Sequence, residues 1–254
     1  MRTCQVSVQL ENLSKRFADN VVLDINDFTI KEGEVLGLVG NNGAGKTTLF
    51  RIILDLLQPT TGSATIVADG AQCYNTAMCE DWKWFTGAYI DAGFLIDYLT
   101  PDEYFSFIAK VNDLDKEHVD AELKRYEDFM GGEIVGQNKL IRSLSAGNKQ
   151  KVGIVAALLH RPGLLILDEP FNFLDPSSQI AMKHMLTDYN SQTGATILVS
   201  SHNLTHTLDI CSRVALLEHG HIIKDYNRAD SDMMTEIVQY FEGNTKHESV
   251  AENA

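Results

Sequence analysis

The stretch "VLGLVGNNGAGKTT", residues 35–48, constrains the fold more than any other part of this 254-residue chain. Its first six residues form a short apolar run, which predicts a strand buried on both faces. The glycine-rich turn that follows fits the pattern G-x-x-x-x-G-K-[ST], and "KTTLFRIILDLL" then has the apolar spacing of a helix. Strand, glycine-rich turn and helix in this order predict an α/β fold with a P-loop.

The residue types of this turn suit a phosphate group. Glycines let successive backbone N–H groups point at phosphate oxygens, and the start of the helix adds a favourable dipole. Lys46 can reach the β- and γ-phosphates, and the Thr47 hydroxyl can bind Mg²⁺. The alternative is a glycine-rich turn that binds no ligand. The predicted nucleotide-binding residues are Gly40, Asn41, Asn42, Gly43, Ala44, Gly45, Lys46, Thr47 and Thr48.

Two further apolar runs end in polar residues. "GLLILDEP" puts Asp168 and Glu169 at the carboxyl end of a buried strand, where α/β folds keep their ligands. Asp168 can hold Mg²⁺ through a water molecule, and Glu169 can orient or deprotonate an attacking water. "ILVSSH" brings His202 to the same edge, where it can contact a γ-phosphate. Taken alone, the acidic pair could be a solvated strand end and the histidine a structural residue.

The rest of the chain predicts an antiparallel sheet at the N-terminus and a helical insertion. "VSVQLENLSKRF" and "VVLDINDFTIKEGE" alternate apolar and polar residues, which predicts two half-exposed strands, and "QPTTGSATIVADG" predicts another. Thr100, Pro101 and Glu103 form a helix start with a capping box. "KEHVDAELKRYEDFM" predicts a second amphipathic helix. We therefore expect a mostly helical insertion at about residues 91–160.

Strand character returns after the insertion. "GLLILDEP" and "ATILVSSH" flank a helical pattern in "SSQIAMKHMLTDYNSQTG", which predicts a parallel sheet, and "RVALLEHGHIIKDY" predicts a closing hairpin. One domain is expected over residues 1–230. A short helix and a flexible acidic tail are expected over residues 231–254.

Composition excludes several classes of protein. The net charge of −14 argues against a nucleic-acid binder, which needs a basic face for phosphates. The sequence contains no apolar run of about 18 residues, so no membrane-spanning helix is expected. The four cysteines show neither CxxC spacing nor histidine partners at zinc spacing, which indicates reduced thiols.

A second segment with residues suited to binding an anion is "LSAGNKQK", residues 144–151. Ser145 is a good N-cap for the helical pattern that follows, so this turn opens a second helix start suited to an anion. Over residues 6–228 the order of motifs resembles that of the ATP-binding subunits of ABC transporters. Their signature motif is usually LSGGQ, for which Ala146 and Asn148 are substitutions here. The resemblance implies that two such subunits pair head to tail and that the signature caps the nucleotide on the partner.

The resemblance assigns roles to other positions. "FNFLDP" matches the D-loop with Asp175, so the residues expected to act on the partner's nucleotide are Ser145, Ala146, Gly147, Asn148 and Asp175. Glu169 matches the catalytic carboxylate and His202 the switch histidine. Phe17 falls where the family has an aromatic residue that stacks on adenine, although it could also be a core residue. Asp91 stands where the family usually has glutamine, and we expect it near the metal.

The resemblance implies an ATPase that uses Mg²⁺ with ATP and powers transport through separate transmembrane permease subunits. It implies a dimer on the cytoplasmic face of the membrane, for which a homodimer is expected and a heterodimer is the alternative, and the chain is most similar to exporter-type, single-cassette subunits. In this family the permease docks close to the segments "CEDWKWF" and "FLIDYL", so Trp82 and Trp84 are candidates for docking or for core packing. Two alternatives are a soluble ABC ATPase of the iron–sulfur assembly type and a regulatory module that binds nucleotide without hydrolysis.

Overall fold

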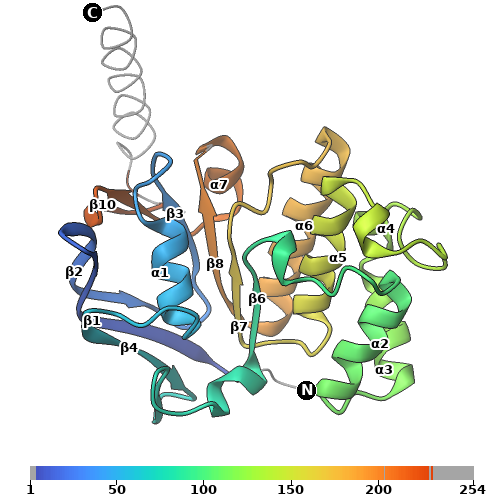
Figure 1. Ribbon diagram of the computed structural model, residues 1–254, viewed down its shortest axis with the longest axis horizontal. Coiled ribbons are helices and arrows are strands. Elements are labelled where there is room, and N and C mark those ends of the chain that lie inside the picture. Colours follow the sequence, from blue (N-terminus) through green and yellow to red (C-terminus); the bar gives the residue numbers. More distant parts are fainter. Residues whose placement is uncertain (1–3, 203, 229, 231–254) are drawn as a thin grey trace, which may run out of the picture.

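Two β-sheets organise the chain in the computed structural model, which describes residues 4–202, 204–228 and 230 (Figure 1). The smaller sheet is antiparallel, with the order β2-β1-β4-β5. It contains β1 (Val6–Phe17), β2 (Asn20–Ile30), β4 (Thr61–Ala68) and β5 (Gln72–Asn75). Buried and exposed residues alternate over much of β1 and β2, which confirms the two predicted half-exposed strands.

The larger sheet has the order β10-β9-β3-β8-β7-β6. Its five strands from β9 to β6 are parallel, and β10 pairs antiparallel with β9 as the predicted hairpin. Every residue of β3, β7 and β8 is buried, as expected for strands covered on both faces. The strands are β3 (Val35–Val39), β6 (Thr86–Tyr89), β7 (Leu164–Leu167), β8 (Thr196–Ser201), β9 (Arg213–Glu218) and β10 (His221–Asn227).

Apolar cores lie on both sides of the larger sheet. On one side, α1 (Lys46–Ile53) packs in a cluster with residues of the smaller sheet, so it lies between the two sheets. On the other side, α5 (Ala146–Leu158) and α6 (Pro176–Thr193) contribute to a second cluster (Figure 1). A further helix, α7 (Leu204–Ile210), follows β8 and was not predicted. None of the helices in the described residues is long and apolar enough to cross a bilayer.

The segment between β6 and β7 contains helices and no strand, and all of its residues are described. Thr100 caps α2 as predicted, since its side chain accepts from the Glu103 backbone and the Glu103 side chain bonds back. The single helix predicted over residues 116–130 is wrong: Tyr126, at φ −99° and ψ 13°, leaves helical geometry and separates α3 from α4. The helices are η2 (Ala92–Phe94), α2 (Pro101–Val111), α3 (Lys116–Arg125), α4 (Glu127–Met130), η3 (Ile141–Ser143) and α5.

The two remaining expectations about domain organisation stay predictions. The insertion boundaries of about 91 and 160 are the first, and the domain limit at residue 230 is the second. The short helix and acidic tail expected over residues 231–254 lie outside the described residues.

Candidate nucleotide site

One edge of the larger sheet gathers the predicted site residues. β3, β8, β7 and β6 are neighbours in that order and run parallel, so the segments that follow them meet at the same edge. The glycine-rich turn follows β3, and His202 follows β8. Asp168 and Glu169 follow β7, and Asp91 comes two residues after β6.

The glycine-rich turn joins β3 to α1 as predicted. Gly45 is the N-cap of α1 at φ 111°, and a Cβ added there would lie 2.8 Å from Leu23 Cδ2 of β2. A side chain is therefore excluded by both backbone conformation and space. Lys46 folds back over the turn: its Nζ donates to the carbonyl oxygens of Gly40 at 2.7 Å and Asn41 at 3.2 Å.

Asp168 is held by two hydroxyl groups at the end of β7. Thr47 Oγ1 donates to Asp168 Oδ2 at 2.5 Å, and the Ser200 hydroxyl donates to Oδ1. Burial raises the pKa of Asp168 above its ordinary value, and the hydroxyl hydrogen bonds oppose this shift. A hydroxyl beside a carboxylate is a donor set that suits Mg²⁺, which binds one or two protein oxygens and completes its shell with phosphate and water. The residues present therefore fit that ion.

Glu169 lies between two basic side chains from other parts of the chain. Its Oε1 is 3.3 Å from Lys46 Nζ, and its Oε2 is 2.8 Å from His202 Nδ1. Its backbone N–H donates to Ser200 Oγ at 2.8 Å, which fixes the turn after β7. Glu169 adopts φ 47°, a conformation that is uncommon for residues other than glycine and that concentrates at functional sites.

Two residues that the sequence analysis did not single out hold the site together. Ser200 bonds both Asp168 and the Glu169 backbone, and its only signal was its position at the end of an apolar strand. Arg51 lies one helical turn after Thr47 on α1, and its guanidinium is 3.5 Å from Asp91 Oδ2.

Asp91 is engaged by groups other than the Thr47–Asp168 pair. Its Oδ1 accepts from the Gly93 backbone at 2.7 Å, and its Oδ2 faces Arg51. Within the described chain, no hydrogen bond joins it to Thr47 or Asp168. Its role as a metal ligand stays a prediction.

Phe17 is not a core residue. It ends β1 at the hairpin with β2, and 49% of it is exposed. Lys15 Nζ lies 4.9 Å from the centroid of its ring. The exposed ring is open to a stacking partner.

The signature turn at residues 144–148 is also the start of a helix, as predicted. Ser145 caps α5 by accepting from the Asn148 backbone at 3.2 Å. A Cβ added to Gly147 would lie 2.6 Å from the carbonyl oxygen of Phe173, so the signature turn packs directly on the segment before α6. Phe173 itself is 75% exposed.

Asp175 begins α6 in the same way. It accepts from the Ser178 backbone at 3.0 Å and from the hydroxyls of Ser177 and Ser178, and these hydrogen bonds lower its pKa. Its carboxylate therefore stays ionised. Signature and D-loop residues share a hollow of about 500 Å³ that includes no residue of the glycine-rich turn. Its lining includes Ser145, Gly147, Asn148, Phe173 and Asp175.

Comparison with known proteins agrees with this geometry. The family model for "ABC transporter" matches residues 23–172. The chain is 33% identical to an uncharacterised ABC transporter ATP-binding protein, YdbJ of Bacillus subtilis (strain 168), over 90% of this chain and 72% of that protein. It is 30% identical to the bacitracin transport ATP-binding protein BcrA of Enterococcus faecalis, over 89% of this chain and 71% of that protein.

Solved structures show the same fold. An ATP-binding subunit of an ABC transporter is 28% identical, with a TM-score of 0.77 over 90% of this chain and 93% of that one. A cassette solved as a dimer with ADP and phosphate is 24% identical, with a TM-score of 0.74 over 87% of this chain and 98% of that one, and this likeness supports the fold alone. The predicted P-loop fold with an N-terminal antiparallel sheet is confirmed, and the soluble iron–sulfur alternative is not favoured. The chain belongs to the ATP-binding proteins of the ABC transporter family, and it is an ATPase subunit that powers transport.

Proposed function

We propose that Glu169 is the general base of ATP hydrolysis and that His202 contacts the γ-phosphate. The observation that carries this proposal is the Glu169 carboxylate, which lies 3.3 Å from the P-loop lysine and 2.8 Å from His202. With ATP bound, Lys46 turns to the β- and γ-phosphates, and Glu169 is released to accept a proton from the attacking water. Residues 40–48 hold the phosphates, and Phe17 stacks on the adenine.

Thr47 and Asp168 are the residues we propose for Mg²⁺, with Asp91 as a further ligand. Mg²⁺ bound with ATP neutralises the charge that develops on the phosphate oxygens. Asp168 needs a cation or hydroxyl groups near it because its carboxylate is 5% exposed. Asp91 can approach the ion only if it gives up Arg51, since the two are 3.5 Å apart.

A second copy of this chain is proposed to complete each site. Ser145, Ala146, Gly147 and Asn148 form a helix start, with Asp175 across the shared hollow, and they lie apart from the chain's own P-loop residues. A helix start binds anions well, so this surface suits the γ-phosphate of ATP held by the partner. Two copies arranged head to tail would enclose two ATP molecules.

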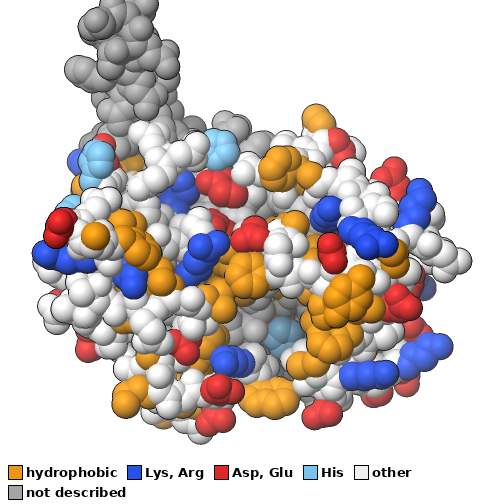
Figure 2. Space-filling model, viewed as in Figure 1, with side chains coloured by type: hydrophobic (Ala, Val, Ile, Leu, Met, Phe, Trp, Pro, Cys, Tyr) orange, Lys and Arg blue, Asp and Glu red, His pale blue; other side chains and the backbone are white. Residues whose placement is uncertain are grey.

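We propose that separate transmembrane permease subunits bind at the cytoplasmic face. An apolar hollow of about 270 Å³ lies between β6, η2 and α2, and Figure 2 shows hydrophobic side chains on this side of the molecule. Trp82 is 3% exposed and belongs to the core, whereas Trp84 is 60% exposed. Phe94 and Tyr98 of "FLIDYL" are also more than half exposed, so these three rings are accessible candidates for docking. No nucleic acid is expected to bind.

The experiment that tests this function uses the Glu169→Gln variant, which should bind ATP without turning it over. Tagged protein is incubated with ATP and detergent-solubilised membranes of the native host, and the captured proteins are identified by mass spectrometry. A stoichiometric polytopic membrane protein is expected. Capture of soluble partners alone would contradict the transport function, and a Lys46→Ala variant serves as the control that cannot hold ATP.

A further inference from the structure

Ser200 is a fully buried serine near the carboxyl end of β8, at the edge of the larger sheet that carries the nucleotide site. In the register of these parallel strands Val199 of β8 lies beside Leu167 of β7, so the next residues along the chain, Ser200 and Asp168, also lie side by side. β3, which leads into the glycine-rich turn, is the neighbour of β8 on its other side. Ser200 therefore lies between the strand that leads to the P-loop and the strand that leads to the acidic pair.

The single hydroxyl of Ser200 makes two hydrogen bonds. It donates to Asp168 Oδ1, and it accepts from the backbone N–H of Glu169 at 2.8 Å. Because a serine hydroxyl has only one proton, these two partners fix its orientation. The other oxygen of the same carboxylate, Asp168 Oδ2, accepts from Thr47 Oγ1 at 2.5 Å. Hydroxyl groups from β8 and α1 thus hold both oxygens of Asp168.

The hydrogen bond to the Glu169 backbone supports an uncommon conformation. Glu169 adopts φ 47°, and residues other than glycine keep such a conformation only where surrounding contacts hold it. Ser200 holds the N–H at the start of this residue. The side chain then faces Lys46 Nζ at 3.3 Å and His202 Nδ1 at 2.8 Å. The direction of the Glu169 carboxylate therefore depends on a backbone that the Ser200 hydroxyl fixes.

We propose that Ser200 is a positioning residue for ATP hydrolysis, whose hydroxyl sets the direction of the Glu169 carboxylate and fixes the orientation of Asp168. This inference rests on the roles proposed above for Glu169 and Asp168. Ser200 is itself fully buried, so it acts only through these two residues. Without the hydroxyl, the Glu169 N–H loses its partner and Asp168 is held from one side only. The turn after β7 is then free to leave the geometry in which Glu169 faces Lys46 and His202.

The experiment compares Ser200→Thr with Ser200→Val, two side chains of nearly the same shape of which only threonine has a hydroxyl. The loss of a hydrogen bond to a charged group corresponds to about tenfold or more in an equilibrium constant. The kcat of phosphate release should therefore be about tenfold or more lower in Ser200→Val than in Ser200→Thr. Affinity for ATP, measured by calorimetry, should differ little, because within the described chain the hydroxyl bonds to no residue of the glycine-rich turn.

A second readout needs no catalysis and no nucleotide. Hydrogen exchange of the Glu169 backbone amide is followed by NMR in the two variants. Exchange should be about tenfold or more faster in Ser200→Val, because only the threonine hydroxyl can accept this N–H. This readout does not depend on which residue is the base. If Glu169→Gln kept the parent's kcat, the proposed function would fail, while amide exchange would still decide whether Ser200 holds this turn.

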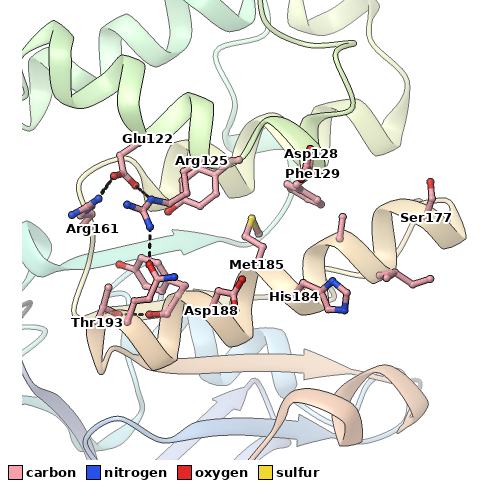
Figure 3. Close-up of a pocket in the computed structure, with 15 residues that line it drawn as sticks. Glu122, Arg125, Asp128, Phe129, Arg161, Ser177, His184, Met185, Asp188 and Thr193 are labelled. Carbon is pink, nitrogen blue, oxygen red and sulfur yellow. Dashed lines mark hydrogen bonds and ion pairs between the residues drawn. The ribbon is translucent and has the colours of Figure 1, made fainter.

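The matched control is Thr193→Val at the end of α6, beside the hollow that α3, α4 and α6 line (Figure 3). Thr193 Oγ1 also joins an oxygen to an N–H, since it donates to the Tyr189 carbonyl at 2.6 Å and accepts from the Ala195 backbone at 3.1 Å. Thr193 precedes β8, whereas Ser200 lies near the carboxyl end of that strand. Because the two sites share no partner, this control should keep kcat and Glu169 amide exchange within about twofold of the parent.

Ser200→Ala removes the hydroxyl without adding volume, and it serves as the second variant if the larger side chains disturb folding. It should lower kcat and speed exchange of the Glu169 amide in the same direction as Ser200→Val, with folding checked by circular dichroism. Equal kcat in folded Ser200→Thr and Ser200→Val would overturn the proposal. A parent-like kcat in folded Ser200→Ala, or a fall in kcat without faster amide exchange, would overturn it as well.

Discussion

Replacement of Glu169 by glutamine tests the proposed chemistry most directly. The amide has the size of the carboxylate, but it cannot take a proton from water, so kcat should fall about 10²–10⁴-fold. This corresponds to about 3–5 kcal/mol in the activation barrier. Folding should be nearly unaffected because Lys46 keeps its hydrogen bonds to the carbonyl oxygens of Gly40 and Asn41 and is not left unpaired.

The stability change can be bounded from the contacts that are lost. Glu169 is 22% exposed and contacts Lys46 at 3.3 Å and His202 at 2.8 Å, and partly exposed ion pairs contribute up to about 1 kcal/mol each. For a chain of this length the two contacts together correspond to a shift in Tm of about 4–8 °C at most. A larger fall would indicate that Glu169 has a structural role.

The assay is steady-state phosphate release at saturating Mg²⁺ and ATP, with ATP binding measured separately by calorimetry. Glu117→Gln, an exposed position in the first turn of α3, is the matched control and should keep the parent's rate. The reasoning is refuted if Glu169→Gln retains kcat within tenfold of the parent while binding ATP. Loss of ATP binding would also contradict it, because Glu169 is not proposed to hold the nucleotide.

Three further predictions follow from other contacts. Asp91→Ala should raise the Mg²⁺ concentration needed for half-maximal ATPase rate, and unchanged Mg²⁺ dependence would show that Asp91 serves only to pair with Arg51. Gly147→Ala should lower kcat about tenfold without changing ATP affinity at the P-loop, because its Cβ would lie 2.6 Å from the Phe173 carbonyl; the rate is measured as phosphate release and the affinity by calorimetry. Burial lowers the pKa of His160 from 6.5 to about 4, so the unfolded chain binds this proton first as pH falls. The free energy of unfolding should therefore fall by up to about 3 kcal/mol as the pH drops from about 6.5 to 4. Denaturant titrations at pH 8 and pH 4.5 measure this change. In the His160→Gln variant the contribution of this histidine to the change should disappear.

The sequence was sufficient to predict the central sheet and its functional edge. Apolar runs followed by "GNNGAGKTT", "DEP" and "SSH" predicted parallel strands, and parallel strands bring the residues after them to one edge. The contacts of Glu169 with Lys46 and His202 follow from that rule, although the three residues are far apart in sequence. Ser145 was predicted as an N-cap for a local reason, since N-caps depend on a few neighbouring residues, whereas the position of Asp175 came from the resemblance of "FNFLDP" to the D-loop.

Other contacts between side chains from different elements were not predictable. The pairing of Arg51 with Asp91 depends on how α1 faces the residues after β6, which no periodicity reveals. Trp82 and Trp84 are two residues apart in "CEDWKWF", yet one is buried and the other exposed, because the short η1 helix (Asp81–Phe85) turns only one of them inward. The amphipathic pattern over residues 116–130 likewise continues past Tyr126, where the chain leaves helical geometry.

Helix α5 connects the surface proposed to bind a partner's nucleotide with the chain's own proposed catalytic residue. The turn at Ser145 begins α5, and Gln150, one turn and a half further along, is 2% exposed and donates from Nε2 to the backbone oxygens of Glu169 and Pro170. Hydrogen bonds from Gln150 therefore join the surface proposed for a partner's nucleotide to the backbone of Glu169, which is the proposed general base of the chain's own site. In the proposed head-to-tail pair, a movement of α5 on closure would be transmitted through these hydrogen bonds to the turn that holds Glu169. This connection gives a physical reason for both sites to reach their hydrolytic geometry together.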